Sequence, residues 1–293
     1  MPALSTRIIS FLLRTTGIYR KMFAGGPRMP DFIAKAQSVP SEPSAKVKAA
    51  LSVTRSDFQG QAVWDIAPRD GAPSATVLYW HGGGYIYPAA SAHWDFIAHM
   101  AGVHRWRVVA PLYPLAPGHD AVAITAFALD FYKDFAAKMG DAPFLMAGDS
   151  AGAGLAAATA MAARDAALPL PAKLILICPW LNVDPVHPDQ PGIEPNDAIL
   201  TIRGIREAGL MYAGTAGVKD RRVSPIFGDW AGLPPILAFG GGSDILVVDA
   251  RALKDLLPAI DYVELDGMIH DWPIFFFPES RDAQARMAAF AAG

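Results

Sequence analysis

The stretch that decides the fold is Phe144-Leu145-Met146-Ala147-Gly148-Asp149-Ser150-Ala151-Gly152. The apolar run over 143–147 predicts a buried strand, and the alanine-rich residues 152–166 predict a helix. Between them lies the pattern G-x-S-x-G, which is typical of a sharp strand-to-helix turn that lifts a serine hydroxyl clear of a sheet. Glycines on both sides of the serine allow such a strained turn. The context therefore favours Ser150 as a nucleophile over a serine that only caps the helix.

On both sides of this turn, short apolar runs alternate with helical patterns of ten or more residues. Strands are expected at 75–80, 107–110, 173–178, 236–239 and 262–265, and helices at 92–103, 121–139, 247–257 and from residue 279. Two earlier strands, 51–58 and 61–67, are joined by a turn at 59–60. The alternation predicts the α/β class, with a mostly parallel central sheet flanked by helices and an antiparallel edge from the first two strands.

Two segments do not follow this alternation. Residues 1–50 are expected to be helical, with an amphipathic helix over about 5–23 that is either an ordinary packing helix or part of a lid. Nearly sixty residues separate the strand ending at 178 from the one beginning at 236, with 182–195 irregular and 201–213 helical. Because a long insertion is often functional, we expect a helical cap made of residues 1–50 and an insertion at about 182–222. Residues 51–293 then form the catalytic domain.

A second motif, His81-Gly82-Gly83-Gly84, follows directly after the strand at 75–80. Three successive glycines leave their backbone N–H groups free to point at a developing negative charge. A phosphate-binding loop would instead end in Gly-Lys-Ser or Gly-Lys-Thr, and this chain has no such ending. The motif lies about seventy residues before G-x-S-x-G. That combination is more specific than either motif alone.

Together the two motifs resemble the hormone-sensitive-lipase-like branch of the α/β hydrolases, of the bacterial carboxylesterase type. The segment 113–117, Tyr-Pro-Leu-Ala-Pro, is similar to the Tyr-Arg-Leu-Ala-Pro segment of that branch, with Pro114 in place of Arg. The resemblance runs from about residue 77 to the C-terminus and implies the α/β-hydrolase fold with a helical cap. It also implies that Gly83, Gly84 and Ala151 donate N–H groups to an oxyanion. Ala153 departs from the family, where many members have a second Gly.

In α/β hydrolases the order along the chain is nucleophile, acid, histidine. Only His187 and His270 follow Ser150. His270 lies after the last expected strand, in a loop at the carboxyl end of the sheet, whereas His187 lies among prolines in the expected cap. Sites of α/β proteins assemble at the carboxyl ends of the strands, so His270 is favoured as the base.

The acid is expected at Asp244, on the loop that follows the strand at 236–239. This position resembles the Asp-x-Leu acid of the family. Three rivals stay open: Asp249, Asp266 and Asp271. Ser150, Asp244 and His270 would form a catalytic triad that hydrolyses an ester through an acyl-enzyme intermediate. Asp149 is expected to brace the turn rather than to act in catalysis.

The substrate is less well defined by the sequence. Tyr85, Tyr87, Trp180 and Trp272 lie beside the motifs and could wall a substrate pocket, although aromatic residues mostly fill cores. Apolar walls would suit a small to medium, fairly hydrophobic ester. Long-chain lipase action is not expected, because no exposed membrane-docking stretch is evident. A lactone or amide hydrolase with the same triad stays open, as does a non-catalytic binding protein that lost its base.

Composition limits the other classes of function. The 293 residues carry a formal net charge of −3 and no run of five like charges, which disfavours a nucleic-acid partner. The single cysteine, Cys178, has no metal-ligand spacing around it, and the expected chemistry needs neither metal nor cofactor. The apolar run 8–13 is too short to span a membrane or to form a typical signal core, which favours a cytoplasmic location. The expected partner is a small-molecule ester, and a homodimer is left open.

Overall fold

The computed structural model describes residues 2–293. One eight-stranded sheet, with strand order β1-β2-β4-β3-β5-β6-β7-β8, forms its centre. The strands are β1 (Ser52–Phe58), β2 (Gln61–Ala67), β3 (Ala75–Trp80), β4 (Trp106–Pro111), β5 (Leu145–Asp149), β6 (Lys173–Ile177), β7 (Ile236–Gly241) and β8 (Asp261–Leu265). The β1–β2 and β2–β4 pairs are antiparallel and the others are parallel. The expected mostly parallel sheet with an antiparallel edge is confirmed.

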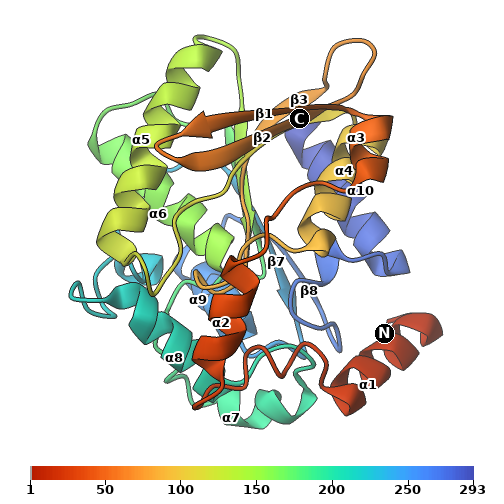
Figure 1. The fold of residues 1–293 in the computed structure, drawn as a ribbon, viewed down its shortest axis with the longest axis vertical. Coiled ribbons are helices and arrows are strands. Elements are labelled where there is room, and N and C mark those ends of the chain that lie inside the picture. The colour runs from red at the N-terminus through yellow and green to blue at the C-terminus, as the bar shows by residue number, and fades with distance from the viewer. Residues whose placement is uncertain (1) are drawn as a thin grey trace.

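Helices cover the sheet on both sides, with α5 and α6 to its left and α3, α4 and α10 to its right in Figure 1. The α-helices are α1 (Leu4–Thr16), α2 (Met29–Gln37), α3 (Ala45–Ala50), α4 (Ser91–Val103), α5 (Ala121–Met139), α6 (Ala151–Asp165), α7 (Gln190–Ile193), α8 (Ile202–Ala213), α9 (Val247–Leu256) and α10 (Pro278–Ala292). None of the helices in the described chain is long and apolar enough to cross a membrane.

The central strands are buried on both faces, because helices cover both sides of this part of the sheet. Strands β3, β5, β6 and β7 are buried along almost their whole length, as their continuous apolar runs predict. Helix α6 is also buried along most of its length. Its many alanines allow it to pack closely on the sheet, and this packing holds its first turn in place directly after Ser150.

The N-terminal helix is shorter than expected, and the prediction that it reaches Phe23 is wrong. Helix α1 ends at Thr16 because Gly17 adopts the left-handed conformation (φ 58°) and donates its N–H to the Leu13 carbonyl oxygen at 3.0 Å. The stretch 182–195 is also not wholly irregular, since it contains α7. These boundaries were missed because a single glycine or a one-turn helix leaves little periodicity in the sequence.

Segments distant in the sequence meet at one end of the sheet, where Figure 1 shows α2, α7 and α8 grouped together. The Thr201 hydroxyl donates to the Phe23 carbonyl oxygen at 2.6 Å, and the Gly26 N–H donates to Glu207 Oε2 at 2.7 Å. Residues of the N-terminal segment therefore lie directly against α8 at this end of the sheet.

Candidate active site

The turn at Ser150 is strained and tightly packed. Ser150 has φ 51° and ψ −119°, a conformation that residues other than glycine rarely adopt. A Cβ on Gly152 would lie 2.0 Å from the Trp80 carbonyl oxygen, and one on Gly148 would lie 2.4 Å from the Gly152 carbonyl carbon. Both glycines of G-x-S-x-G are thus required by close backbone approach. The Ser150 N–H donates to the Ile177 carbonyl oxygen at 2.8 Å, which holds the turn against β6.

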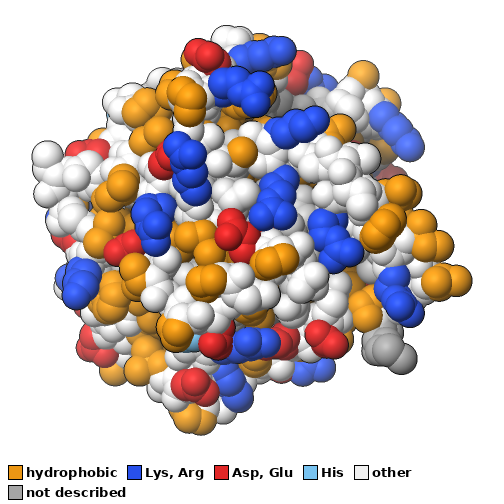
Figure 2. Space-filling model, turned by 90° about the horizontal axis from the view of Figure 1, so that it is seen from below, with side chains coloured by type: hydrophobic (Ala, Val, Ile, Leu, Met, Phe, Trp, Pro, Cys, Tyr) orange, Lys and Arg blue, Asp and Glu red, His pale blue; other side chains and the backbone are white. Residues whose placement is uncertain are grey.

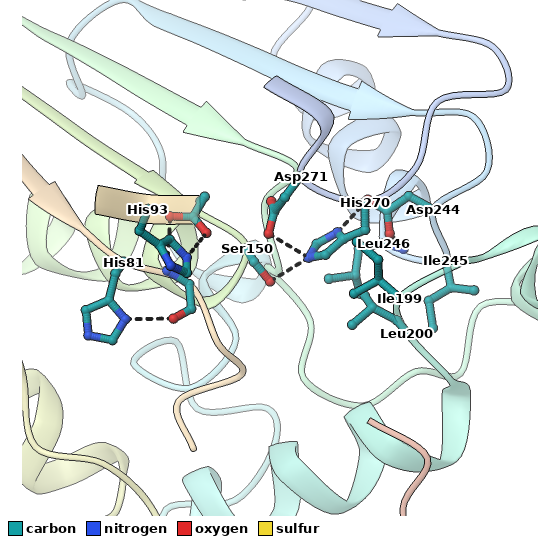
Figure 3. Close-up of polar contacts among 12 residues, drawn as sticks. His81, His93, Ser150, Ile199, Leu200, Asp244, Ile245, Leu246, His270 and Asp271 are labelled. Atoms are coloured by element: carbon teal, nitrogen blue, oxygen red, sulfur yellow. Dashed lines mark hydrogen bonds and ion pairs between the residues drawn. The ribbon is translucent and has the colours of Figure 1, made fainter. Parts of the chain in front are cut away.

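Three side chains distant in the sequence form one hydrogen-bonded row at this turn (Figure 3). His270 Nε2 lies 2.9 Å from Ser150 Oγ, and His270 Nδ1 lies 2.8 Å from Asp244 Oδ2. All three residues are buried. Asp244 lies on the loop after β7 and His270 on the loop after β8, so the row sits at the carboxyl ends of neighbouring strands. Asp244 Oδ1 also accepts from the Leu246 N–H at 2.8 Å, which fixes the carboxylate.

A second carboxylate faces the same imidazole from the other side. Asp271 Oδ2 lies 3.1 Å from His270 Nε2, the nitrogen that also contacts Ser150. Burial alone would lower the pKa of His270, but the charges of Asp244 and Asp271 outweigh it and hold this pKa well above its usual value. Burial raises the pKa of Asp271 to about 7, partly opposed by the charge of His270. The sequence left Asp271 only as a rival for the acid, whereas the structure places it at Nε2.

The glycine loop is held by the residue that precedes the serine. Asp149 Oδ1 accepts from the Gly82 N–H at 3.0 Å and from the Tyr79 hydroxyl, and Asp149 Oδ2 lies 3.0 Å from His93 Nε2. Burial would raise the pKa of Asp149, but His93 and the hydrogen bonds lower it. Asp149 thus ties the loop after β3 to the turn at Ser150, in agreement with its expected bracing role.

The next two glycines need conformations that only glycine adopts easily. Gly83 has φ +113° and Gly84 has φ +63°, and a Cβ on Gly83 would lie 2.6 Å from the Tyr87 carbonyl oxygen. Within residues 2–293, no hydrogen bond of the loops uses the N–H of Gly83 or Gly84. Ala151 is the first residue of α6, so its N–H belongs to the positive end of a helix. These three N–H groups are therefore available to an anion beside Ser150.

An apolar cavity of about 250 Å³ opens onto the Ser150 and His270 side chains. Besides Ser150, Gly83, His270 and Asp271, its walls include Met22, Phe23, Tyr87, Ile199, Leu200 and Phe275. The walls thus come from the N-terminal segment, the loop after β3, the insertion after β6 and the loop before α10. The sequence predicted a cap from residues 1–50 and the insertion, but it did not single out Met22, Phe23, Ile199 or Leu200. Only the tertiary fold decides which side chains of these segments reach the cavity.

Of the four aromatic residues expected to wall a pocket, Tyr87 lines the cavity and the other three do not. Tyr85 is buried with its ring stacked on Tyr212 at 3.6 Å between centroids. Trp272 donates its indole N–H to the Gly240 carbonyl oxygen at 3.1 Å, and Trp180 is also buried in the core. Proximity to a motif in the sequence did not determine which way these side chains point.

The remaining rivals lie elsewhere. Asp249 accepts from the N–H groups of Leu181 and Asn182 at 2.7 and 2.8 Å, and burial raises its pKa to about 7. Asp266 and His187 are exposed on the surface. None of these three side chains hydrogen-bonds with Ser150 or His270 among the described residues, so of the candidate acids only Asp244 and Asp271 contact the imidazole.

Asp197, which no sequence signal singled out, links the insertion to the loop that carries Asp244. Its carboxylate accepts from the N–H groups of Ile199 and Leu200, each at 2.8 Å, and of Ile245 at 2.9 Å. Burial, followed by the charge of Asp244, raises its pKa to about 7. It thereby positions two cavity-lining residues relative to the acid.

One group of potential metal ligands occurs in the described chain, and it overlaps the site. The Cys178 sulfur, one His270 nitrogen and an Asp271 oxygen lie within 4.8 Å of one another. Burial raises the pKa of the Cys178 thiol well above its usual value, which disfavours the thiolate that metals bind. The imidazole of His270 already bonds with Ser150 and Asp244, so these residues are a poor fit to a metal.

Comparisons with known proteins agree with this architecture. The family model described as alpha/beta hydrolase fold matches residues 77–274. The Mycobacterium tuberculosis protein LipR is 33% identical over 254 residues, which cover 84% of this chain and 82% of LipR. An acetyl-hydrolase of Streptomyces hygroscopicus is 30% identical, with 73% of this chain and 74% of that protein covered. A crystal structure of an esterase from the bacterial hormone-sensitive lipase family superimposes with a TM-score of 0.83 at 25% identity, covering 100% of this chain and 99% of that chain.

Proposed function

Because the chain belongs to the hormone-sensitive-lipase-like branch of the α/β hydrolases and is thus an ester hydrolase, we propose a serine carboxylesterase with Ser150 as nucleophile. His270 is the base, Asp244 the acid, and Gly83, Gly84 and Ala151 form the oxyanion hole. The observation that carries this proposal is the hydrogen-bonded row from Asp244 through His270 to Ser150, which ends at an apolar cavity.

The mechanism follows from the positions of the hydrogen-bonding atoms. Asp244 accepts the Nδ1 proton of His270 and so leaves the Nε2 lone pair facing Ser150 Oγ. Nε2 takes the serine proton while Oγ attacks the ester carbonyl carbon, and the negative oxygen is held by backbone N–H groups. His270 then protonates the leaving alcohol, which leaves an acyl-serine. A water molecule, deprotonated by the same nitrogen, releases the acid and restores the serine.

The cavity supports small to medium, fairly hydrophobic and uncharged esters. Its volume of about 250 Å³ leaves room for a short acyl chain and a modest alcohol group. Apolar walls cannot solvate a charge, and Asp271 in the lining would repel an anionic group. A neutral ester meets neither penalty.

The cap is also part of the proposal. Residues 1–50 and the insertion at about 182–222 contribute Met22, Phe23, Ile199 and Leu200 to the cavity walls. A cover of this kind would exclude water from the reacting ester and set the acyl length that fits. A cytoplasmic location is proposed as well, and fractionation of cells that express the protein would test it.

The test is hydrolysis of p-nitrophenyl acetate and butyrate, compared with matched lactones and anilides. Ser150→Ala should lower kcat by about 10³-fold or more, while Ser56→Ala, an exposed serine on β1, should leave it unchanged. A fluorophosphonate probe should add its mass to the wild type and not to Ser150→Ala. Unchanged turnover in Ser150→Ala, or labelling of another residue, would refute the proposed nucleophile.

A further inference from the structure

Helix α1 turns its apolar face away from the body of the protein. Leu4, Ile8, Phe11 and Leu12 lie on one side of the helix at the spacing of an apolar stripe, and their exposed fractions are 70%, 51%, 55% and 52%. Ile9 borders the stripe and is also exposed. An ordinary surface helix buries such a stripe. No exposed apolar stretch was expected in this segment, so the exposure of the stripe departs from that expectation.

Polar contacts hold α1 in this orientation. Thr6, on the opposite side of the helix, is fully buried, and its hydroxyl donates to Glu279 Oε2 at 2.7 Å. The Ala3 N–H donates to Glu279 Oε1 at 2.5 Å, and Arg14 Nη1 donates to Asn196 Oδ1 at 3.1 Å. Turning the helix to bury the stripe would break these bonds and leave polar groups unpaired. The exposed stripe is thus a consequence of specific contacts.

The charged residues of the N-terminal segment itself have one sign. Residues 2–30 contain Arg7, Arg14, Arg20, Lys21 and Arg28 and no Asp or Glu. Arg7 and Lys21 form no ion pair with a carboxylate in the described part of the chain. Figure 2 shows orange apolar side chains gathered with blue basic ones at the right-hand edge, where α1 lies in Figure 1. An apolar stripe bordered by arginines is the pattern of a helix that lies in a membrane interface.

We propose that α1 docks this protein on an anionic lipid surface. Leu4, Ile8, Phe11 and Leu12 would enter the boundary between headgroups and acyl chains, and Arg7 and Arg14 would contact lipid phosphates. A second copy of the chain fits less well, because a symmetric pairing of these faces would bring the two sets of arginines together without any acidic partner on the helix.

Docking would also place the cavity beside the lipid. Helix α1 is followed by Ile18, which is 61% exposed, and by Tyr19, which lines the cavity. A hydrophobic ester dissolved in the membrane could then reach the cavity without crossing water. This consequence rests on the proposed esterase function, whereas lipid docking itself does not.

The experiment is sedimentation of the full chain with vesicles of phosphatidylcholine alone or mixed with phosphatidylglycerol. We expect binding to the mixed vesicles that weakens with salt, and little binding to phosphatidylcholine alone. The triple variant Ile8→Ser, Phe11→Ser, Leu12→Ser should bind the mixed vesicles at least about tenfold more weakly, since three apolar side chains no longer enter the lipid.

The matched control is Val103→Ser, Val122→Ser, Leu256→Ser, which removes three exposed apolar side chains from α4, α5 and α9. It should bind the mixed vesicles like the wild type. Both triple variants should retain wild-type turnover of p-nitrophenyl acetate in solution, which would show that their fold and site are intact. If the wild type itself did not hydrolyse this ester, the result would count against the esterase proposal and not against docking.

A second variant, Arg7→Gln, keeps the stripe and the contacts that orient α1, and removes one charge. It should weaken binding to the mixed vesicles and reduce its salt dependence. Three outcomes overturn the proposal: no binding of the wild type to mixed vesicles at low salt, equal binding by the wild type and the α1 triple variant, or a dimer in sedimentation equilibrium that this variant abolishes. The last outcome would assign the stripe to self-association.

Discussion

Replacing Asp271 by Asn should move the acidic limb of the pH–rate profile to lower pH. Asp271 Oδ2 lies 3.1 Å from His270 Nε2, so its negative charge favours the protonated imidazole. The other titratable groups that face this pair are Asp244, at Nδ1 of the same ring, Asp149 and His93. All three remain in the variant. His270 must lose its proton before it can accept one from Ser150, so kcat/KM rises with pH through the His270 pKa.

The size of the shift can be bounded from the geometry. Two unit charges 3.1 Å apart interact by about 5 kcal/mol at an effective dielectric constant of about 20, or roughly four pH units. That is an upper limit, because Asp271 has a pKa of about 7 and carries only part of its charge near neutral pH. The pair also titrates as a unit. We therefore expect a shift of about one to two pH units toward lower pH in Asp271→Asn.

The assay is kcat/KM for p-nitrophenyl butyrate from about pH 5 to about pH 9, which spans the titration of a histidine base. Asp266→Asn is the matched control, because Asp266 lies in the same loop but is exposed and forms no bond with His270. Its profile should equal that of the wild type. An acidic limb of Asp271→Asn that stays in place, or moves to higher pH, would refute the assigned role of this carboxylate.

Three further substitutions test the rest of the site. Asp244→Asn should lower kcat by about 10³- to 10⁴-fold with Tm nearly unchanged, and a loss below about tenfold would assign the acid to another residue. Gly83→Ala places a Cβ 2.6 Å from the Tyr87 carbonyl oxygen and should lower kcat by about 10²-fold by displacing the oxyanion loop; an unchanged kcat would contradict this. Gly152→Ala places a Cβ 2.0 Å from the Trp80 carbonyl oxygen and should destabilise the protein by about 3 kcal/mol, measured as a lower Tm. A wild-type Tm would contradict the conclusion that only glycine fits at this position.

The sequence predicts the strands and most of the helices, because each of these elements has its own local pattern of apolar and capping residues. Helix α5 begins and ends at the expected residues, since Asp120 caps its start and Gly140 follows its end. The loop positions of Ser150, Asp244 and His270 follow from chain order and from the rule that sites form at the carboxyl ends of strands. These inferences need no knowledge of side-chain direction.

What the sequence could not predict depends on contacts between distant segments. The orientation of α1 is set by the bond between Thr6 and Glu279, which lie 273 residues apart in the chain. Periodicity identifies an apolar stripe but does not say whether the stripe is buried. For the same reason, Tyr85 beside the glycine motif is a core residue, whereas Phe23 and Leu200 line the cavity.

The three buried carboxylates near the serine differ in how neighbouring groups compensate their negative charge. Asp149 faces His93, whose pKa is raised although burial alone would lower it. Asp244 faces the Nδ1 side of His270 and accepts a backbone N–H. Asp271 has one oxygen at Nε2, while its other oxygen, Oδ1, is buried without a hydrogen-bond partner in the described chain. A buried acceptor of this kind is costly. Because Asp271 also lines the cavity and the other two do not, it is the one of these three carboxylates that a bound substrate can contact directly.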